Sequence, residues 1–287
     1  MVQGPNGEIY VRSYGQPTSR TPLIVLHGGP AAGHRYMRPY ARLAADRRTI
    51  FYDQSGCGRS ARPADLGSYT VDTYVRELEA VRAWSGAAQV ILLGHSWGGA
   101  LALAYAAAYP QHVAGLVLAG TAARIADFET AAQRWLAAMG PDAVRIAATE
   151  ENVGGAPSAR FQALQDAYYR EHLLRLPSWP DWFTQVAEEA AGNPVYRYLN
   201  GPSEFRFTGA LSSLDLTDTL PALRVPTLIT CGEFDEAPPW VGSKLAARIH
   251  LARLHTWPGL SHMAHIEAPQ TVVPATAHFL HSIDRTA

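Results

Sequence analysis

The chain has few cysteines, almost no net charge and no long apolar run. Its two cysteines, Cys57 and Cys231, cannot form a disulfide framework, which fits a reducing cytoplasm. The formal net charge of −1 gives no compositional argument for nucleic acid or an anionic membrane surface as a partner. No apolar segment approaches the roughly 18 residues of a membrane-spanning helix, and the N-terminus lacks a secretory signal. We therefore expect a soluble, cytoplasmic protein that binds neither nucleic acid nor membrane.

The composition is that of an ordinary globular protein, with 47% hydrophobic and 17% charged residues, and 287 residues can bury a sizeable core. Over the first 120 residues, short apolar runs alternate with stretches of helical spacing. The pattern predicts strands at 22–29, 48–54, 89–94 and 113–120, and helices at 69–85 and 97–109. This alternation indicates an α/β fold, with a mostly parallel sheet and helices on both faces.

The middle of the chain breaks this alternation. Residues 121–210 contain helical stretches and no clear strand, and the strand–helix order resumes with an apolar run at Pro226. We therefore expect one α/β core, residues 1–120 and 211–287, with an all-helical cap inserted at 121–210.

One short segment carries the strongest chemical signal. Residues 94–98 are Gly-His-Ser-Trp-Gly, a G-x-S-x-G pattern that follows a predicted strand and opens a predicted helix. The serine then lies on a turn so tight that only glycine fits two residues away on either side. This turn lifts the hydroxyl above the carboxyl edge of the sheet, at a helix start that favours developing negative charge. We predict that Ser96 is a nucleophile.

A serine nucleophile needs an acid and a base, which follow it along the chain in the order Ser, Asp, His. Asp235 comes just after an apolar strand, so we expect it at the same sheet edge as Ser96. Asp215 and Asp218 precede that strand and belong to the opposite edge. We predict that Asp235 is the acid.

Two histidines after the final predicted strand compete for the role of base. His262 lies in the loop itself, three residues after Gly259, where a ring can reach over the sheet edge. His265 stands at the entrance to the following helix, which favours a structural role. We predict that His262 is the base.

The oxyanion formed during acyl transfer needs two backbone N–H donors. One is expected from Trp97, the residue after the nucleophile, and the other from a loop after an early strand. The segment His-Gly-Gly-Pro at 27–30 supplies such a loop, and we predict Gly29 as its donor; the alternative is a simple turn. Because no HExxH pattern or clustered His/Cys spacing is present, we expect neither a metal nor another cofactor.

Together these segments resemble the α/β-hydrolase superfamily and, within it, the proline iminopeptidase family. The resemblance covers nearly the whole chain, through HGGP at 27–30, YDQSGCGRS at 52–60, GHSWGG at 94–99, GEFDE at 232–236 and SHMAH at 261–265. It implies the α/β-hydrolase fold with an inserted helical cap. Ala31 and Ser55 stand where the family commonly has glycine and arginine, which bears on fine positioning and substrate preference rather than on reaction class.

The family also has a GPNEF-like segment in its cap, whose glutamate binds the free α-amino group of the substrate. GPSEF at 201–205 matches this segment, with Ser203 in place of asparagine, and Glu236 occupies the place of a second family glutamate. The resemblance therefore implies that Glu204 and Glu236 bind the substrate ammonium together. Charge-assisted hydrogen bonds of this kind contribute about 1.5–3 kcal/mol each.

Other roles are open for the polar and aromatic residues of the cap. Glu204 could instead pair with Arg197 or Arg206 and only hold the cap together. Several aromatic residues could line a pocket for an apolar first residue, although aromatics at helical spacing usually belong to the core. These are Trp135, Trp179, Trp182, Phe183, Phe205 and Phe207.

The combined pattern predicts a cofactor-free serine hydrolase that acts through an acyl-enzyme. Its expected activity is release of an N-terminal residue, proline or a small apolar residue, from short peptides or amino-acid amides. The expected partner is then a small molecule or short peptide with a free amino group. The alternative is an esterase, or a specialised amide or lactone hydrolase, with a repurposed cap. An inactive ligand-binding relative would be expected to have lost part of the triad, which is complete here. The oligomeric state stays open.

Overall fold

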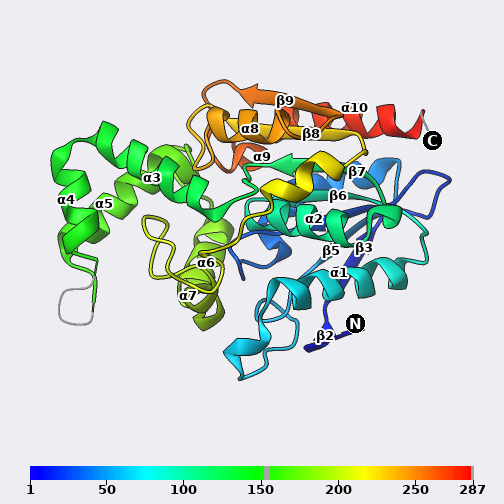
Figure 1. Ribbon diagram of the computed structural model, residues 1–287, viewed down its shortest axis with the longest axis horizontal. Coiled ribbons are helices and arrows are strands. Elements are labelled where there is room, and N and C mark those ends of the chain that lie inside the picture. The colour runs from blue at the N-terminus through cyan, green and yellow to red at the C-terminus, as the bar shows by residue number, and fades with distance from the viewer. Residues whose placement is uncertain (152–155, 286–287) are drawn as a thin grey trace.

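The computed structural model describes residues 1–151 and 156–285 of the chain. Its central strands are β3 (Val11–Tyr14), β4 (Leu23–Leu26), β5 (Thr49–Tyr52), β6 (Val90–His95), β7 (Val113–Ala119), β8 (Thr227–Gly232) and β9 (Ala252–Trp257). They form a seven-stranded sheet in the order β3-β5-β4-β6-β7-β8-β9 (Figure 1). β3 is antiparallel to β5, and the other neighbouring pairs are parallel. The predicted α/β fold with a mostly parallel sheet is confirmed.

Helices cover both faces of the sheet because its inner strands are apolar on both sides. Alternate side chains of β4 and β6 enter two separate apolar clusters, one on each face. The first cluster includes side chains of α1 (Val71–Ser85), α2 (Trp97–Ala108) and α8 (Pro239–Ala246). The second includes side chains of the 3-10 helix η1 (His34–Ala45) and of α10 (Pro269–Asp284). Burial of both faces is what a parallel sheet of this class requires.

Shorter elements complete the core. They are the hairpin strands β1 (Val2–Gly4) and β2 (Gly7–Ile9), the 3-10 turns η2 (Leu66–Ser68), η3 (Pro110–His112) and η5 (Thr217–Ala222), and α9 (Ala264–Glu267). Within the described ranges, no helix is both long and apolar enough to span a lipid bilayer.

Between β7 and β8 the chain forms a group of helices at one end of the sheet (Figure 1). This cap contains α3 (Ile125–Met139), α4 (Pro141–Thr149), α5 (Ala159–Tyr168), the π-helical turn η4 (Tyr169–Leu173), α6 (Asp181–Ala191) and α7 (Pro194–Leu199). A separate apolar cluster joins α3, α4 and α5 to Phe205. Residues 152–155 of the expected cap and 286–287 of the expected core lie outside the described residues. In the rest of 121–210, helices occur without a strand of the sheet, as predicted.

The direction of the strands brings the predicted site residues under the cap. β7 and β9 point toward it in Figure 1, and their parallel neighbours run the same way. The loops that follow these strands therefore meet beneath the cap helices, at the carboxyl edge where α/β sheets place their ligands.

Candidate active site

Ser96 lies on the turn between β6 and α2, with φ 55° and ψ −126°. A side chain at Gly94 would place its Cβ 2.2 Å from the carbonyl oxygen of Gly98, and one at Gly98 would lie 2.4 Å from that of Leu26. Both glycines are therefore required for the strand and helix to approach so closely. The Ser96 amide donates to Ala119 O at 2.9 Å, which ties the turn to β7. Ser96 is partly exposed at the sheet edge.

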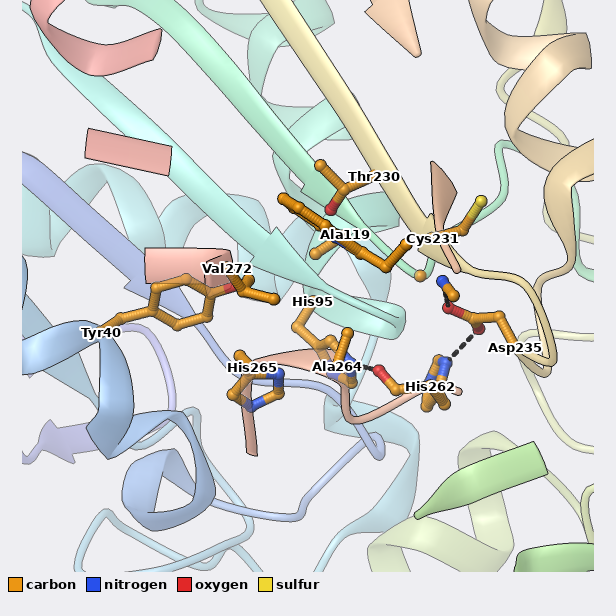
Figure 2. Close-up of a pocket in the computed structure, with 13 residues that line it drawn as sticks. Tyr40, His95, Ala119, Thr230, Cys231, Asp235, His262, Ala264, His265 and Val272 are labelled. Carbon is orange, nitrogen blue, oxygen red and sulfur yellow. Dashed lines mark hydrogen bonds and ion pairs between the residues drawn. The ribbon is translucent and has the colours of Figure 1, made fainter. Parts of the chain in front are cut away.

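The predicted acid and base meet above the same edge. His262 Nδ1 donates to Asp235 Oδ1 at 2.6 Å, and both side chains are buried (Figure 2). The amides of Gly232 and Ala237 donate to the two Asp235 oxygens at 3.0 and 2.8 Å, so the carboxylate is fully supported. The bond at Nδ1 fixes the tautomer of the neutral ring and leaves Nε2 as the basic nitrogen.

Ser96 Oγ and His262 Nε2 do not form a hydrogen bond in the part of the chain that the structure describes. The loop of His262 nevertheless lies close to the turn of Ser96. The Ser96 amide is bonded to Ala119 at the end of β7, and a side chain at the next residue, Gly120, would place its Cβ 2.8 Å from His262 Nδ1. The carboxyl oxygen Oε2 of Glu236 lies 3.6 Å from Nε2. Catalytic hydrogen bonds are often long without substrate and tighten on binding.

The predicted oxyanion donors flank the nucleophile. A side chain at Gly28 would place its Cβ 2.8 Å from Ser96 Cβ, so the loop after β4 runs directly against the serine. Gly29 has φ 113°, a left-handed value that favours glycine. Within residues 1–151 and 156–285, the amides of Gly29 and Trp97 donate no hydrogen bond, whereas the Gly28 amide is bonded to Tyr36. Two amides near Ser96 are thus free to bind an anionic oxygen.

A chain of hydrogen bonds that sequence analysis missed joins this loop to the base. The Gly28 amide donates to Tyr36 Oη at 2.6 Å, and that hydroxyl donates to His95 Nδ1 at 2.9 Å. His95 Nε2 then donates to the carbonyl oxygen of His262 at 2.9 Å (Figure 2). Burial lowers the pKa of His95 well below its usual range, so the ring stays neutral. His95 therefore positions His262, and its place beside the nucleophile was the only signal in the sequence.

The second histidine after β9 has a structural environment. His265 stacks on Tyr40 at 5.1 Å between ring centroids, and burial lowers its pKa to about 3. It lines a cavity of about 10 Å³ behind His262, together with Tyr40 and His95 (Figure 2). This volume holds about one water molecule and is far too small for a substrate.

Glu204 and Glu236 come from different segments of the chain, and both interact electrostatically with His262. Glu236 directly follows Asp235 and is buried, while Glu204 lies in the cap loop after α7 and accepts a hydrogen bond from Tyr196 Oη. The alternative ion pair of Glu204 is not formed, because Arg206 pairs with Glu151 at 2.7 Å. Across the described chain, no arginine or lysine forms an ion pair with Glu204 or Glu236, and Glu236 Oε1 accepts no hydrogen bond.

These two carboxyl groups are costly to ionise. Burial raises the pKa of Glu204, although the Tyr196 hydrogen bond and the charge of His262 oppose the shift. Burial also raises the pKa of Glu236, with repulsion from Glu204 and Asp235 adding to it and the charge of His262 opposing it. Carboxylates at such a site gain strongly from a positive charge placed between them.

The cap is hydrogen-bonded to the acid and base themselves. Trp135 Nε1 of α3 donates to the Asp235 carbonyl oxygen at 3.0 Å. The His262 amide donates to the His172 carbonyl oxygen in η4 at 3.0 Å, and the next amide, of Met263, donates to Leu173 at 2.9 Å. The rings of Trp135 and His172 stack at 4.2 Å. The cap therefore helps to place the triad, a role that sequence analysis did not assign to Trp135 or His172.

Most other aromatic residues considered for a pocket are core residues of the cap or of the sheet. Phe183, Phe205 and Phe207 are buried in apolar clusters. Trp179 and Trp182 pack partly exposed against the cluster that covers η1. In the described ranges, none of these five side chains forms a hydrogen bond or a ring contact with Ser96 or His262.

One group of side chains could in principle bind a metal ion. Potential ligand atoms of His27, Asp53 and Cys57 lie within 4.8 Å of one another. However, His27 Nε2 accepts from the Gln54 amide at 3.0 Å, and Asp53 accepts from the amides of His34 and Arg59. Burial raises the pKa of Cys57 well above its usual range, which keeps a protonated thiol there. These contacts indicate that the group stabilises the loop after β4, which contains Gly29, and the loop after β5.

Comparison with known proteins agrees with this geometry. The family model described as alpha/beta hydrolase fold matches residues 21–269. Proline iminopeptidase of Thermoplasma volcanium is 37% identical over 258 residues, covering 89% of this chain and 87% of that protein. Proline iminopeptidase of Saccharolobus solfataricus is 34% identical over 278 residues, covering 96% and 89%. The crystal structure of proline iminopeptidase from Mycobacterium smegmatis superposes with a TM-score of 0.91 at 32% identity, covering 99% of this chain and 98% of that one. The chain therefore belongs to the α/β-hydrolase superfamily and, within it, to the proline iminopeptidase family of serine hydrolases.

Proposed function

We propose that the protein is an aminopeptidase that releases an N-terminal proline, or a small apolar residue, from short peptides or amino-acid amides. The observation that carries the proposal is the pair Glu204 and Glu236. Glu236 is buried with its Oε2 3.6 Å from His262 Nε2, Glu204 interacts with the charge of the same ring, and neither has an arginine or lysine partner in the described chain. Buried carboxylates are normally paired. A pair left open next to a nucleophile fits a substrate that brings its own cation.

The proposed reaction is acyl transfer through a covalent intermediate. Ser96 Oγ attacks the carbonyl carbon of the first residue while His262 Nε2 takes the hydroxyl proton, and Asp235 stabilises the resulting imidazolium. The amides of Gly29 and Trp97 bind the oxyanion. His262 then gives its proton to the leaving amine, and water, activated by the same ring, hydrolyses the acyl-enzyme.

The two glutamates explain how such an enzyme would select a chain end. The α-amino group of a substrate lies one carbon atom from the carbonyl that Ser96 attacks. A carboxylate 3.6 Å from His262 Nε2 is therefore close enough to bind that ammonium while the carbonyl is at the serine. An acylated amino group has no positive charge and would leave both carboxyl groups unpaired, which is costly. The site would thus reject blocked or internal residues.

The proposal is tested by comparing free and blocked substrates at the same carbonyl. We expect proline- and alanine-p-nitroanilide to be cleaved with kcat/KM values at least about 100-fold above those of their N-acetyl forms, since two charge-assisted hydrogen bonds are lost. p-Nitrophenyl acetate measures the intrinsic reactivity of the serine. Equal turnover of free and blocked anilides would overturn the proposal, and efficient ester cleavage alone would favour an esterase, or an amide or lactone hydrolase, with a repurposed cap.

A further inference from the structure

The basic nitrogen of His262 faces a carboxyl group other than that of the triad. Glu236 Oε2 lies 3.6 Å from Nε2, while Nδ1 is bonded to Asp235 Oδ1 at 2.6 Å. Both glutamate and histidine are buried, and Glu236 Oε1 has no hydrogen-bond partner in the described chain. Nε2 is also the atom that must take the proton of Ser96. Glu236 is therefore placed to influence the charge of the base directly.

The ionisable groups around this histidine are carboxyl groups and groups that stay uncharged near pH 7. The carboxyl groups are Asp235 and Glu236 from the loop after β8 and Glu204 from the loop after α7. The others are His95 of β6, His172 of η4, His265 of α9, Tyr168 of α5, Tyr169 of η4 and Tyr196 of α7. Burial lowers the pKa of each of these histidines and raises the pKa of each tyrosine, so all of them are uncharged near pH 7.

This surplus of carboxyl groups makes the empty site hold protons. Burial alone would lower the pKa of His262, but attraction to Asp235, then to Glu236 and Glu204, raises it to about 9. Burial raises the pKa of Glu236 as well. Glu236 and His262 together therefore bind more protons at neutral pH than the two side chains would bind in water. These protons supply the positive charge that the neighbouring carboxyl groups otherwise lack. A protonated ring cannot accept the proton of a serine.

We propose that Glu236 couples recognition to catalysis: with His262 it holds a proton that blocks the base in the empty site, and the ammonium of the substrate displaces that proton. The inference rests on the proposed function, because it needs Glu204 and Glu236 to receive an ammonium. The positive charge of the ammonium replaces that of the proton between the carboxylates. The proton passes to solvent buffer, the amino group stays protonated, and His262 Nε2 becomes the free base beside Ser96. Only a substrate with a free amino group would then switch on its own hydrolysis.

The direct test is a proton count on binding. L-Prolinamide and L-alaninamide are titrated into the S96A protein, in which hydrolysis is blocked, by calorimetry in two buffers of different ionisation enthalpy. At pH 6.5 the amine enters already protonated, since α-amino groups titrate at about 7.7–8.0. We expect release of about one proton per bound ligand, as linkage between ligand and proton requires. Release should fall by at least about half in S96A/E236Q, because one shared proton site is gone.

A matched control removes a charge from the same loop without touching the ring. Glu233 is exposed and accepts from the Gly259 amide at 2.9 Å, so S96A/E233Q should release the same proton as S96A. N-Acetyl-L-prolinamide, which carries no ammonium, should release none. Binding of L-prolinamide without proton release, or equal release from S96A and S96A/E236Q, would overturn the inference while leaving aminopeptidase activity possible.

A second measurement does not depend on recognition of an amine. The pH profile of kcat/KM for p-nitrophenyl acetate reports the base of the free enzyme. We expect its midpoint to lie about one pH unit lower in E236Q than in the wild type and in E233Q, since removal of one nearby carboxylate makes the imidazolium less stable by about that amount. Thermal unfolding confirms that each variant is folded. Identical midpoints in E236Q and E233Q would sink the inference even if free amides were strongly preferred over blocked ones.

Discussion

The carboxyl groups at the sheet edge and on the cap side differ in how many hydrogen bonds they accept. Asp235, at the sheet edge, accepts three hydrogen bonds, from two backbone amides and from His262. Glu204, in the cap loop, accepts from Tyr196, and Glu236 at the boundary has an oxygen with no donor in the described chain. A carboxylate whose oxygens all accept hydrogen bonds is fixed in one position, whereas a buried oxygen without a donor is free to accept a hydrogen bond from a ligand. This difference agrees with the proposal that residues at the sheet edge carry out the reaction and that Glu204 and Glu236 select the substrate.

The largest effect should come from the sheet edge. S96A should lower kcat by at least about 10⁴-fold for anilides and esters alike, because it removes the proposed nucleophile on which cleavage of every substrate depends. Initial rates with proline-p-nitroanilide and p-nitrophenyl acetate measure this loss. The variant should still bind L-prolinamide, since the two glutamates are intact. Substantial residual turnover would mean that the sheet edge is not where the reaction occurs.

The next effect should separate the cap from the sheet edge. Glu204→Gln should lower kcat/KM for free-amine anilides by about 10- to 150-fold, corresponding to loss of one charge-assisted hydrogen bond of about 1.5–3 kcal/mol. The loss should appear mainly in KM, while p-nitrophenyl acetate is cleaved at nearly the wild-type rate. Glu188→Gln, at an exposed position of α6, is the matched cap control. Parallel losses with anilide and ester would assign Glu204 a structural role instead.

A smaller effect should come from a cap side chain that forms a hydrogen bond with the acid, because this contact links the cap to the sheet edge. Trp135→Phe removes the indole donor to the Asp235 carbonyl oxygen and retains most of the stacking with His172. Loss of a neutral hydrogen bond of about 1 kcal/mol should lower kcat about five-fold, with little change in KM. Trp182→Phe, in α6, serves as control because the described chain offers its Nε1 no acceptor. A change confined to KM would place Trp135 in substrate binding rather than in support of the triad.

Glu236 should make the stability of the folded protein depend on pH. The pKa of Glu236 is raised by burial to about 8 from the usual 4.5, so the folded state holds this proton more tightly than the unfolded state. Its contribution to stability is present below pH 4.5 and is lost as pH rises through about 8. Glu236→Gln should therefore weaken the decline of the free energy of unfolding between these pH values. Urea midpoints at pH 5, 6.5 and 8 measure it, and an unchanged slope would contradict the assignment.

The smallest effect concerns the loop of the oxyanion donors. Ala31 has a φ of 68°, which lies in the left-handed region that favours glycine. Ala31→Gly should remove this strain and raise the free energy of unfolding by up to about 1 kcal/mol, partly offset by the entropy of glycine in the unfolded chain. For a chain of this size the melting temperature should rise by at most about 2–4 °C. A lower melting temperature would show that packing of the Ala31 methyl group outweighs the strain.

The sheet edge was predictable from sequence because local rules determine it. Two glycines around Ser96, an apolar strand before Asp235 and a loop after β9 are visible in short windows, and each follows from sterics or burial. Parallel strands then bring the three side chains to one edge without further information. This is why fold class and candidate triad could be proposed before the structure.

The cap contacts were not predictable for the same reason. Trp135 and Asp235 are 100 residues apart, and no local pattern marks an indole that reaches a distant carbonyl group. The π-helical turn at 169–173 has no sequence signature of its own. η1 was also missed, since Pro39 interrupts its helical spacing and the segment folds as a 3-10 helix. Resemblance to a family pointed to Glu204, whereas physics alone left its role open.

The shared hydrogen bonds between η4 and the loop of His262 have a consequence for engineering. Two successive amides of that loop, those of His262 and Met263, use carbonyl oxygens of the cap. The cap and the loop that contains His262 therefore depend on each other and should be exchanged together. A chimaera that takes the cap of a relative should also take residues 261–265 from it, because the transplanted backbone must match both acceptors. Recombination within this family should accordingly favour crossovers that keep the two segments together.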